Sequence, residues 1–304
     1  NVGFVRSVNR ALEFAEHHVA LVNTDVEVPD EWLERLMFPI LMDSKVATTT
    51  PFTTCGTICS FPDFCKDNQI FEGMALWQVD EAFRKIRPLY PSMPTGVGFC
   101  MGMNIQAVRE IGVLDADTFG KGYGEENDWC QRAIEAGYRN VHVDNLFVYH
   151  KHGGSFPSEE KMKLLEHNRK ELVKKHPDYD RDTASYCRKD PLRTVRLYVQ
   201  MHLLNQKLDV PTIVAFDHIL GGGATEYLKE KKKSALTDGY RFITITFDFY
   251  TGRYYLNYEY RQYNFEFYAN KLEGLFDNIL RIDEIWINEL VTYQYLYQTL
   301  DDIV

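Results

Sequence analysis

The alternation of helix-like and strand-like patterns in residues 1–52 constrains the fold more than any other feature. Apolar side chains recur every three or four residues over 4–15, which is typical of a helix, and the short apolar run VALVN at 19–23 predicts a buried strand. A second helix pattern begins near Pro29, and the run KVATTTPF at 45–52 predicts another strand. The order helix, strand, helix, strand predicts parallel crossover connections and therefore a layered α/β domain.

Similar patterns continue through the middle of the chain. GVGFCMGMNI (96–105) and NVHVDNLFVYH (140–150) predict strands, and DWCQRAIEAG (128–137) predicts a helix that ends at a glycine. Residues 53–94 show scattered proline, aspartate and aromatic residues without a period. We interpret that segment as a long excursion over the surface.

The second half of the chain predicts a separate unit. Residues 158–206 are helical and charged in pattern, and a strand, a glycine turn and a helix then follow. Two β-rich runs around Thr251 and Gly252 predict a hairpin. We therefore expect three segments, namely a domain over 1–157, a helical extension or linker over 158–207 and a partial α/β domain over 208–304.

Composition excludes several classes of protein. The 304 residues are 45% apolar, which suffices for two domain cores. A formal net charge of −10 argues against nucleic acid as a partner, and no apolar run is long enough to span a membrane. Six cysteines are too few for a disulfide scaffold, so we expect a reducing, cytoplasmic compartment. The spacing of Cys55, Cys59 and Cys65 matches no zinc motif, which favours a structural or incidental role.

A carboxylate follows the first predicted strand, where Asn23, Thr24 and Asp25 end the run LVNTD. Ligands of open α/β sheets gather at the carboxyl ends of parallel strands. Hard cations such as Mg²⁺ or Mn²⁺ take one or two protein carboxylates together with substrate phosphates. A metal site and a plain chain turn are both compatible with this stretch, and turns of this kind are common.

Three carboxylates crowd the stretch KGYGEENDWCQRA, at Glu125, Glu126 and Asp128. Acidic residues at a helix start are ordinary partners of the helix dipole. Adjacent carboxylates on a tight turn diverge, however, so one could hold an acceptor hydroxyl while the other removes its proton. A general base beside a like charge has a raised pKa, which suits proton abstraction near neutrality. The stretch by itself leaves capping and catalysis open.

Two further features stand at strand ends. His150 and His152 precede a glycine-rich turn, and a neutral imidazole there could complete a cation's ligand shell or bind a diphosphate. His218 and the three glycines at 221–223 lie between a predicted strand and a helix, but they form neither a GxGxxG motif nor a P-loop. We interpret the latter as turn residues.

Together these stretches resemble the family 2 glycosyltransferases of GT-A fold over about residues 1–156. NVGFVRSVNRAL is similar to the family's N-x-GF-x-x-x-x-N segment, and LVNTDVEV is similar to its metal-binding aspartate motif, with Asn-Thr-Asp in place of Asp-x-Asp. The stretch from PTGVGF to HKHGGSF is similar to the family's acceptor-side and catalytic half. The bacterial branch that builds surface polysaccharides, including rhamnosyltransferase-like members, is the part of the family that the chain most resembles.

The resemblance implies a role for each matching residue on the donor side. Asp25 would bind the Mn²⁺ or Mg²⁺ ion that holds the sugar nucleotide's diphosphate, with Asn23 and Thr24 beside it. His150 would be a second metal or diphosphate ligand. The first segment would place Arg6 and Asn9 on the same donor side.

On the acceptor side the resemblance assigns catalysis to the carboxylate pair. Glu126 occupies the position of the catalytic base, where the family usually has aspartate, and Glu125 would bind the acceptor. Gly96 and Gly98 would let the acceptor approach, and Asp128 would join the acceptor side or support the turn. The implied reaction is an inverting single displacement at the anomeric carbon.

The same resemblance predicts the architecture: a GT-A, Rossmann-like mixed sheet with helices on both faces. In the family a βαβ unit precedes the GF segment and holds the nucleotide base and ribose. We expect that unit to be missing here, which leaves open whether a chain without it is active. Residues 208–304 weakly resemble the first half of a GT-B glycosyltransferase domain, through HILGGGATEYL.

The expected partners are a nucleotide-sugar donor and a saccharide acceptor, with a lipid-linked saccharide among the alternatives. The expected location is the cytoplasm, including the inner face of the membrane. Two other functions stay open. One is a catalytically inactive carbohydrate-binding or scaffold protein, and the other is a sugar nucleotidyltransferase, which also binds metal through carboxylates on an α/β fold.

Overall fold

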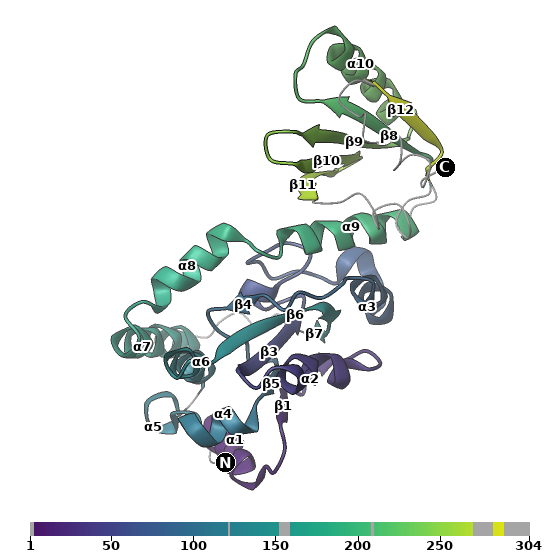
Figure 1. Cartoon of the computed structure of the whole chain (residues 1–304). Helices are drawn as coiled ribbons and strands as arrows, with labels where there is room; N and C mark the ends of the chain where they lie inside the picture. Colours follow the sequence, from purple (N-terminus) through teal and green to yellow (C-terminus); the bar gives the residue numbers. More distant parts are fainter. Residues whose placement is uncertain (1–2, 121, 152–158, 208–209, 270–281, 289–304) are drawn as a thin grey trace. The chain divides into compact units, whose positions relative to one another are not determined.

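A computed structural model of the 304-residue chain describes residues 3–120, 122–151, 159–207, 210–269 and 282–288. The chain forms two compact units that divide between Leu192 and Arg193 (Figure 1). Each unit has a five-stranded sheet of its own. None of the helices in the described ranges combines the length and the apolar character that a membrane span requires.

The first unit alternates helices and strands, as the sequence predicts. Its α-helices are α1 (Phe4–Phe14), α2 (Trp32–Met42), α3 (Leu76–Arg84), α4 (Ile105–Ile111), α5 (Ala116–Phe119), α6 (Glu125–Glu135), α7 (Glu159–Lys175) and α8 (Tyr179–Lys189). Its strands are β1 (Val19–Val22), β2 (Val26–Glu27), β3 (Val46–Phe52), β4 (Ser92–Met93), β5 (Cys100–Met103), β6 (Arg139–Phe147) and β7 (Tyr149–His150). Two short 3-10 helices, η1 (Thr57–Cys59) and η2 (Phe71–Gly73), interrupt the connection from β3 to α3.

The main sheet of this unit is mixed, with strand order β1-β5-β3-β6-β4 (Figure 1). β3 and β6 are parallel, whereas β5 runs antiparallel to both of its neighbours, β1 and β3. The crossover from β1 through α2 to β3 therefore joins strands of the same direction, as predicted, but β5 is inserted between them. A small second sheet pairs β2 with β7.

Helices cover both faces of the main sheet. On one face α1, α4 and α6 pack on β1, β3 and β5 through a core that includes Leu12, Met101 and Trp129. On the other face α2 packs through Leu36 and Ile40 against residues of β3, β5 and β6. These two apolar layers confirm the expected α/β fold class with a mixed sheet.

Residues 53–94 differ from the expected surface excursion, because part of the segment is core. Phe61 and Phe83 are fully buried and form an aromatic cluster with Phe52 of β3 and Phe147 of β6, with ring-centroid distances between 4.8 and 5.9 Å in the contacting pairs. Aromatic pairs at such distances stabilise a core beyond the area that they bury. The prediction failed because apolar residues scattered without a period give no pattern, although they converge in space.

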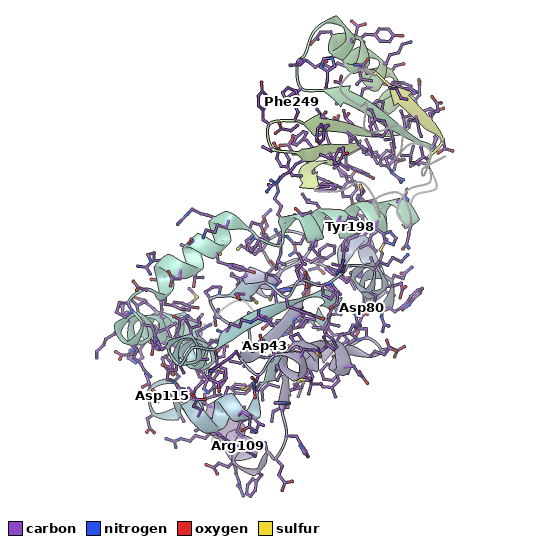
Figure 2. All side chains as sticks on the ribbon, in the orientation of Figure 1. Asp43, Asp80, Arg109, Asp115, Tyr198 and Phe249 are labelled. Atoms are coloured by element: carbon purple, nitrogen blue, oxygen red, sulfur yellow. The ribbon has the colours of Figure 1, made fainter. Side chains whose placement is uncertain are left out.

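Asp80 on α3 fixes this segment to the sheet (Figure 2). Its side chain is almost fully buried, and it accepts hydrogen bonds from Arg35 of α2, Arg84 of α3 and the backbone amide of Phe147. A buried carboxylate that is fully paired in this way ties three elements together, and removing one partner would leave a buried charge.

The second unit contains α9 (Arg193–Lys207), β8 (Thr212–His218), α10 (Gly223–Thr237), β9 (Arg241–Asp248), β10 (Arg253–Tyr260), β11 (Tyr263–Ala269) and β12 (Glu284–Ile287). Its sheet has the order β11-β10-β9-β8-β12, in which β8 is parallel to β9 and β12 and the β9-β10-β11 part is antiparallel. The predicted hairpin is confirmed, since Gly252 donates to the Asp248 carbonyl in the turn between β9 and β10. Gly221 and Gly222 turn the chain into α10 with φ of 70° and 112°, which non-glycine residues rarely adopt.

The boundary between the units lies inside the segment that the sequence assigned to a linker. Helix α9 packs on β11, and the buried guanidinium of Arg241 donates to the Leu204 carbonyl at 3.1 Å and to Thr212 Oγ1 at 3.2 Å. These contacts place residues 193–207 in the second unit. Helices α7 and α8 belong to the first, so the proposed segment 158–207 is divided between two cores.

Candidate active site

A cavity of about 320 Å³ opens in the first unit where several of the predicted site residues meet. Its walls come from the start of α1, the end of β1, the segment before β5, the turn before α6 and the end of β7. The lining residues are Phe4, Asn23, Cys55, Val97, Gly98, Phe99, Gly122, Tyr123, Glu125, Glu126 and His150. The structure thus brings Asn23, Gly98, Glu125, Glu126 and His150, predicted from separate motifs, into one place.

The strand-end aspartate and histidine meet because two short strands pair. Val26 of β2 lies opposite His150 of β7, and the Lys151 amide donates to the Asp25 carbonyl at 2.9 Å. This pairing sets His150 Nε2 3.3 Å from Asp25 Oδ1. The Asn23 amide donates to the Phe99 carbonyl at 2.8 Å, which fixes the end of β1 beside the same site.

The imidazole of His150 is held in a defined orientation. It is 8% exposed and stacks on Phe99, with 5.4 Å between ring centroids and 15° between planes. Its Nδ1 lies 3.4 Å from the Cys55 carbonyl. If Nδ1 carries the proton toward that carbonyl, Nε2 presents a lone pair toward Asp25, which is the tautomer that a metal ligand needs.

Asp25 and His150 fit a divalent cation as a two-residue set. Two ligand atoms of one octahedral Mg²⁺-type ion lie about 3 Å apart, close to the 3.3 Å observed between Oδ1 and Nε2. Within the described residues, no group of three or more His, Cys, Asp or Glu side chains is placed to hold a metal ion. A cation here would therefore need further ligands from substrate or water, as Mg²⁺ commonly does.

The turn that precedes α6 is built from three successive residues with positive φ. Gly122, Tyr123 and Gly124 have φ of 94°, 69° and 116°. Such a conformation is unfavourable for a tyrosine and persists only where the surroundings impose it. Asn168 of α7 supplies that constraint, because its buried side-chain amide donates to the carbonyls of Gly122 at 2.8 Å and Tyr123 at 2.9 Å.

Glu125 and Glu126 begin α6 at the wall of the cavity. Glu125 is 5% exposed, and the Oε2 atom of each carboxylate is buried without a hydrogen-bond partner in the described part of the chain. Burial, reinforced by the charge of Glu126, raises the pKa of Glu125 to about 8. Burial also raises the pKa of Glu126. Because the two groups are adjacent, they titrate as a pair that retains a proton near neutral pH.

Asp128 points away from this pair and is held by structural partners. It accepts hydrogen bonds from Arg132 at 2.8 Å and His176 at 3.0 Å, and its Oδ1 lies 2.6 Å from Lys175 Nζ. Burial alone would raise its pKa, but Lys175, His176 and Arg132 outweigh that effect and lower it. Asp128 does not line the cavity, so its placement corresponds to support of the turn rather than to acceptor binding.

Lys175 extends the same network to α5. Its ammonium lies 2.7 Å from Asp115 Oδ2, and Asp115 caps α5 by accepting from the amides of Asp117 and Thr118 (Figure 2). The hydrogen bond from Lys175 helps to lower the pKa of Asp115, against the opposing effect of burial. The back of α6 is therefore a fully paired ionic cluster that contributes to stability.

The two predicted acceptor-side glycines, Gly96 and Gly98, differ in what a side chain at each position would contact. A Cβ on Gly96 would lie 2.7 Å from Met101 Sδ, and the Gly96 amide faces Cys130 Sγ at 3.1 Å, so packing requires this glycine and it lies outside the cavity wall. A Cβ on Gly98 would meet only Glu126, at 3.9 Å. Gly98 is thus the glycine that leaves room beside the carboxylate pair.

Asp25 contacts His150 but does not itself line the cavity, and the remaining donor-side predictions also lie outside it. Asn9 is a clamp, since it donates to the Leu114 carbonyl at 2.7 Å and accepts from the Leu114 amide at 3.0 Å. Arg6 is exposed and lies 3.8 Å from Asp117, and Thr24 is exposed in the turn after β1. The Asn9 side chain is thus engaged with the backbone of Leu114, whereas Arg6 and Thr24 are exposed.

Within the described residues, the clustered cysteines belong to no group of three or more side chains that could hold a metal ion. All six cysteines are free thiols, and burial raises the pKa of Cys100 to about 12 and that of Cys130 to about 11. Cys55 lines the cavity, whereas Cys65 Sγ lies 3.6 Å from Cys187 Sγ. His152 lies outside the described residues.

Sequence reasoning missed several residues that shape the site. Phe99 orients His150, Tyr123 lines the cavity, and Asn168 holds the turn. Burial and the charge of Glu126 raise the pKa of Tyr179 at the start of α8, which places this phenol near the pair. Phe99 and Tyr123 could have been found, because they stand inside the quoted motifs. Asn168 and Tyr179 gave no signal, because they come from helices that the sequence assigned to a linker.

Comparison with known proteins gives little further information. No family model matches the sequence, and no curated protein matches it. Among solved structures, the crystal structure of GalNAc-T7 with UDP, GalNAc and Mn²⁺ is similar at 16% sequence identity and a TM-score of 0.37, over 65% of this chain and 41% of that chain. The chain thus spans less than half the length of that protein. A similarity of this size carries no weight for function, which rests on the geometry of the cavity.

Proposed function

We propose that this chain is a metal-dependent glycosyltransferase that transfers a sugar from a nucleotide-sugar donor to a hydroxyl group of a saccharide acceptor. One observation carries the proposal. One cavity is lined by two adjacent carboxylates, each with a buried oxygen that has no hydrogen-bond partner among the described residues, and by a histidine that contacts a strand-end aspartate. The first group can take a proton from an acceptor, and the second can bind a cation and the phosphates of a donor.

Glu126 is the base in this proposal, and Glu125 holds the acceptor hydroxyl. Gly98 leaves the space next to Glu126 open, so a hydroxyl group can approach the carboxylate. Asn127 and Gln131 of α6 donate to Thr95 Oγ1 at 2.8 Å and to the Pro94 carbonyl at 2.6 Å, which fixes the segment before Gly98 against the helix that carries the base. A raised pKa gives the carboxylate enough basicity to deprotonate a hydroxyl as it attacks.

Asp25 and His150 would hold the divalent cation, Mn²⁺ or Mg²⁺, with Asn23 beside them at the cavity wall. When bound, such a cation stabilises the negative charge that develops on a leaving diphosphate. His150 contributes by keeping Nε2 directed at Asp25, through its stacking on Phe99. Arg6 and Thr24 are exposed and remain proposed contacts of the donor. Asn9 instead holds the backbone at Leu114.

The finer features of the proposal rest on the resemblance to family 2 glycosyltransferases. They are an inverting displacement, a role in bacterial surface polysaccharide synthesis and a cytoplasmic location that includes the inner face of the membrane. A saccharide acceptor, free or lipid-linked, is the corresponding substrate. The part of the second unit over 208–304 is proposed to be a partial GT-B-like domain.

The direct test is transfer activity of Glu126→Gln. Nucleotide-sugar donors are screened with Mn²⁺ and saccharide acceptors, and release of the nucleoside diphosphate is measured. We expect the wild-type rate to fall by about 10²–10⁴-fold in Glu126→Gln, because the base is lost while the shape of the side chain is kept. Glu13→Gln is the matched control, since Glu13 is exposed on α1, and it should retain the full rate.

Two results would contradict the proposal. Equal rates in wild type and Glu126→Gln would remove the base assignment. Saccharide binding without any donor turnover would favour the non-catalytic carbohydrate-binding alternative.

A further inference from the structure

A second cavity, of about 490 Å³, lies in the second unit between α10 and the turn that joins β10 to β11. We propose that it binds a phosphate-bearing ligand. The volume is within the range of small-molecule sites, about 300–1,000 Å³. The site is independent of the cavity in the first unit, so the proposal does not depend on the transferase function.

One face of α10 supplies a basic wall. Lys229, Lys232 and Lys233, followed by Leu236 and Thr237, line the cavity. Their spacing of three, four, seven and eight residues from Lys229 places them on one side of a helix. The lysine run KEKKK therefore does not distribute evenly around α10, since three lysines face the cavity.

The opposite wall comes from the turn between β10 and β11. Arg261 lies in this turn, with its guanidinium 5.1 Å from the ring centre of the buried Tyr260. This cation–π contact stabilises the position of the guanidinium. Tyr263 and Asn264 add a hydroxyl group and an amide to the lining. Because the cationic groups come from two separate elements, they surround the space instead of forming a single solvated helix face.

The positive charge of the lining is only partly neutralised. Lys232 pairs with Glu259, and both are less than a quarter exposed, while Lys229 pairs outside the lining with Glu226 at 2.7 Å. Neither Lys233 nor Arg261 has a carboxylate within ion-pair distance in the described part of the chain. The lining thus contains four cationic side chains and one carboxylate, in a chain whose net charge is −10.

Phosphate is the ligand chemistry that fits this arrangement. Arginine and lysine bind phosphate through charge-assisted hydrogen bonds, and arginine can do so in a bidentate manner. A hydroxyl group and an amide at the rim can bind the remaining oxygens. The same chemistry is present in a soluble diphosphate and in the head group of an anionic lipid, and the experiment distinguishes these two sources.

The test uses the full chain and two probes, without divalent cations and with EDTA so that the Asp25–His150 pair cannot bind through a metal. Inorganic pyrophosphate is titrated calorimetrically, and vesicles of phosphatidylglycerol are compared with vesicles of phosphatidylcholine by co-sedimentation. The test variant is Lys233→Gln/Arg261→Gln. The control is Lys231→Gln/Arg253→Gln, which removes the same charge from α10 and β10 at positions outside the cavity.

We expect at least one phosphate probe to bind the wild type, and the test variant to bind it about tenfold or more weakly, as the loss of charge-assisted hydrogen bonds predicts. The control should stay within about twofold of wild type. Binding of pyrophosphate indicates a soluble ligand, and binding only of phosphatidylglycerol vesicles indicates a lipid head group. The proposal is overturned if neither probe binds the wild type, or if both double variants weaken binding equally, since the attraction is then a general effect of charge.

Discussion

The two sides of the first turn of α6 contain the same kind of side chain in opposite electrostatic states. Toward the cavity, Glu125 is buried and Glu126 is half-buried, each has a buried oxygen without a partner in the described residues, and both have raised pKa values. Toward α7, Asp128 is equally buried but has a lowered pKa, because Lys175, His176 and Arg132 surround it. Among the described residues, the cations that pair with carboxylates of this turn lie on the Asp128 side.

This difference separates stability from chemistry. A carboxylate that is fully paired stabilises the fold but is a poor base, since its proton affinity is low. A buried carboxylate pair without cations destabilises the charged form and so acquires proton affinity. Asp128 anchors α6, and that anchor allows the Glu125–Glu126 pair to remain in an unfavourable environment.

The largest expected loss of stability comes from the Asp128 side of the turn. Asp128→Asn leaves the side chains of Arg132, Lys175 and His176 without their shared carboxylate, in a region where Asp128 itself is fully buried. We expect the free energy of unfolding to fall by about 2–4 kcal/mol, somewhat below the value for a fully buried pair because the two cations are partly exposed. Urea denaturation at pH 7 measures it.

The control for this substitution is Asp117→Asn. Asp117 is on α5 with an almost fully exposed side chain, 3.8 Å from Arg6, so we expect a loss under about 0.5 kcal/mol. Equal losses in the two variants would show that Asp128 has no special role as an anchor.

An intermediate effect is expected at the hydrogen bonds that hold the turn. Asn168→Ala removes both donations to the Gly122 and Tyr123 carbonyls, and we expect a loss of about 1–2 kcal/mol in the free energy of unfolding. Because the turn carries Glu125 and Glu126, kcat of sugar transfer should fall more than the affinity for the donor changes. Thermal unfolding and steady-state kinetics are the measurements.

The comparison for Asn168 is His167→Ala, at an exposed position on the same helix. That variant should retain kcat. A normal kcat in Asn168→Ala would show that the positive-φ turn holds its shape without the clamp.

How much of this could be predicted from the sequence depends on where the partners lie. The predicted α/β class and the approach of Asp25 to His150 follow from strand ends that share a sheet edge, although the β2–β7 pairing that joins them is too short to give a pattern. The carboxylate pair was found because its residues are adjacent. The lowered pKa of Asp128 was not predicted, because Lys175 and His176 are 47 and 48 residues away, at the end of a helix with no distinguishing motif.

Other errors have the same origin. The core position of Phe61 and Phe83 depends on packing between distant segments, which periodicity does not detect. Gly96 was assigned to acceptor approach, yet its glycine is required by the Met101 side chain. The residue types and their spacing predict which side chains could take part in a reaction. Tertiary contacts decide whether those side chains are instead occupied by ion pairs or packing.

An effect of the opposite direction, a gain in stability, is expected on the cavity side, and its size depends on pH. The ordinary pKa of a glutamate is 4.5, and in the folded chain that of Glu125 is about 8. The folded state therefore binds more protons than the unfolded state between these values, so the free energy of unfolding falls as the pH rises from about 4.5 toward 8. Glu125→Gln should remove this loss and therefore stabilise the chain at pH 8.5, with no gain at pH 4.

Thermal unfolding of Glu125→Gln at these two pH values checks the expectation. Glu13→Gln, exposed on α1, should show no such pH-dependent gain. A destabilisation at pH 8.5 would mean that the Glu125 carboxylate has a stabilising partner when it is charged.

The pH dependence of sugar transfer tests the central claim most directly, namely that the uncompensated carboxylate pair is the base. For wild type, kcat/KM should rise with pH through an apparent pKa well above 4.5, because the pair must lose its proton before it can accept one from the acceptor. In Glu125→Gln this apparent pKa should shift downward, since the neighbouring charge is gone and Glu126 alone titrates. A profile that is flat above pH 5 in wild type, or one that Glu125→Gln leaves unchanged, would contradict the account.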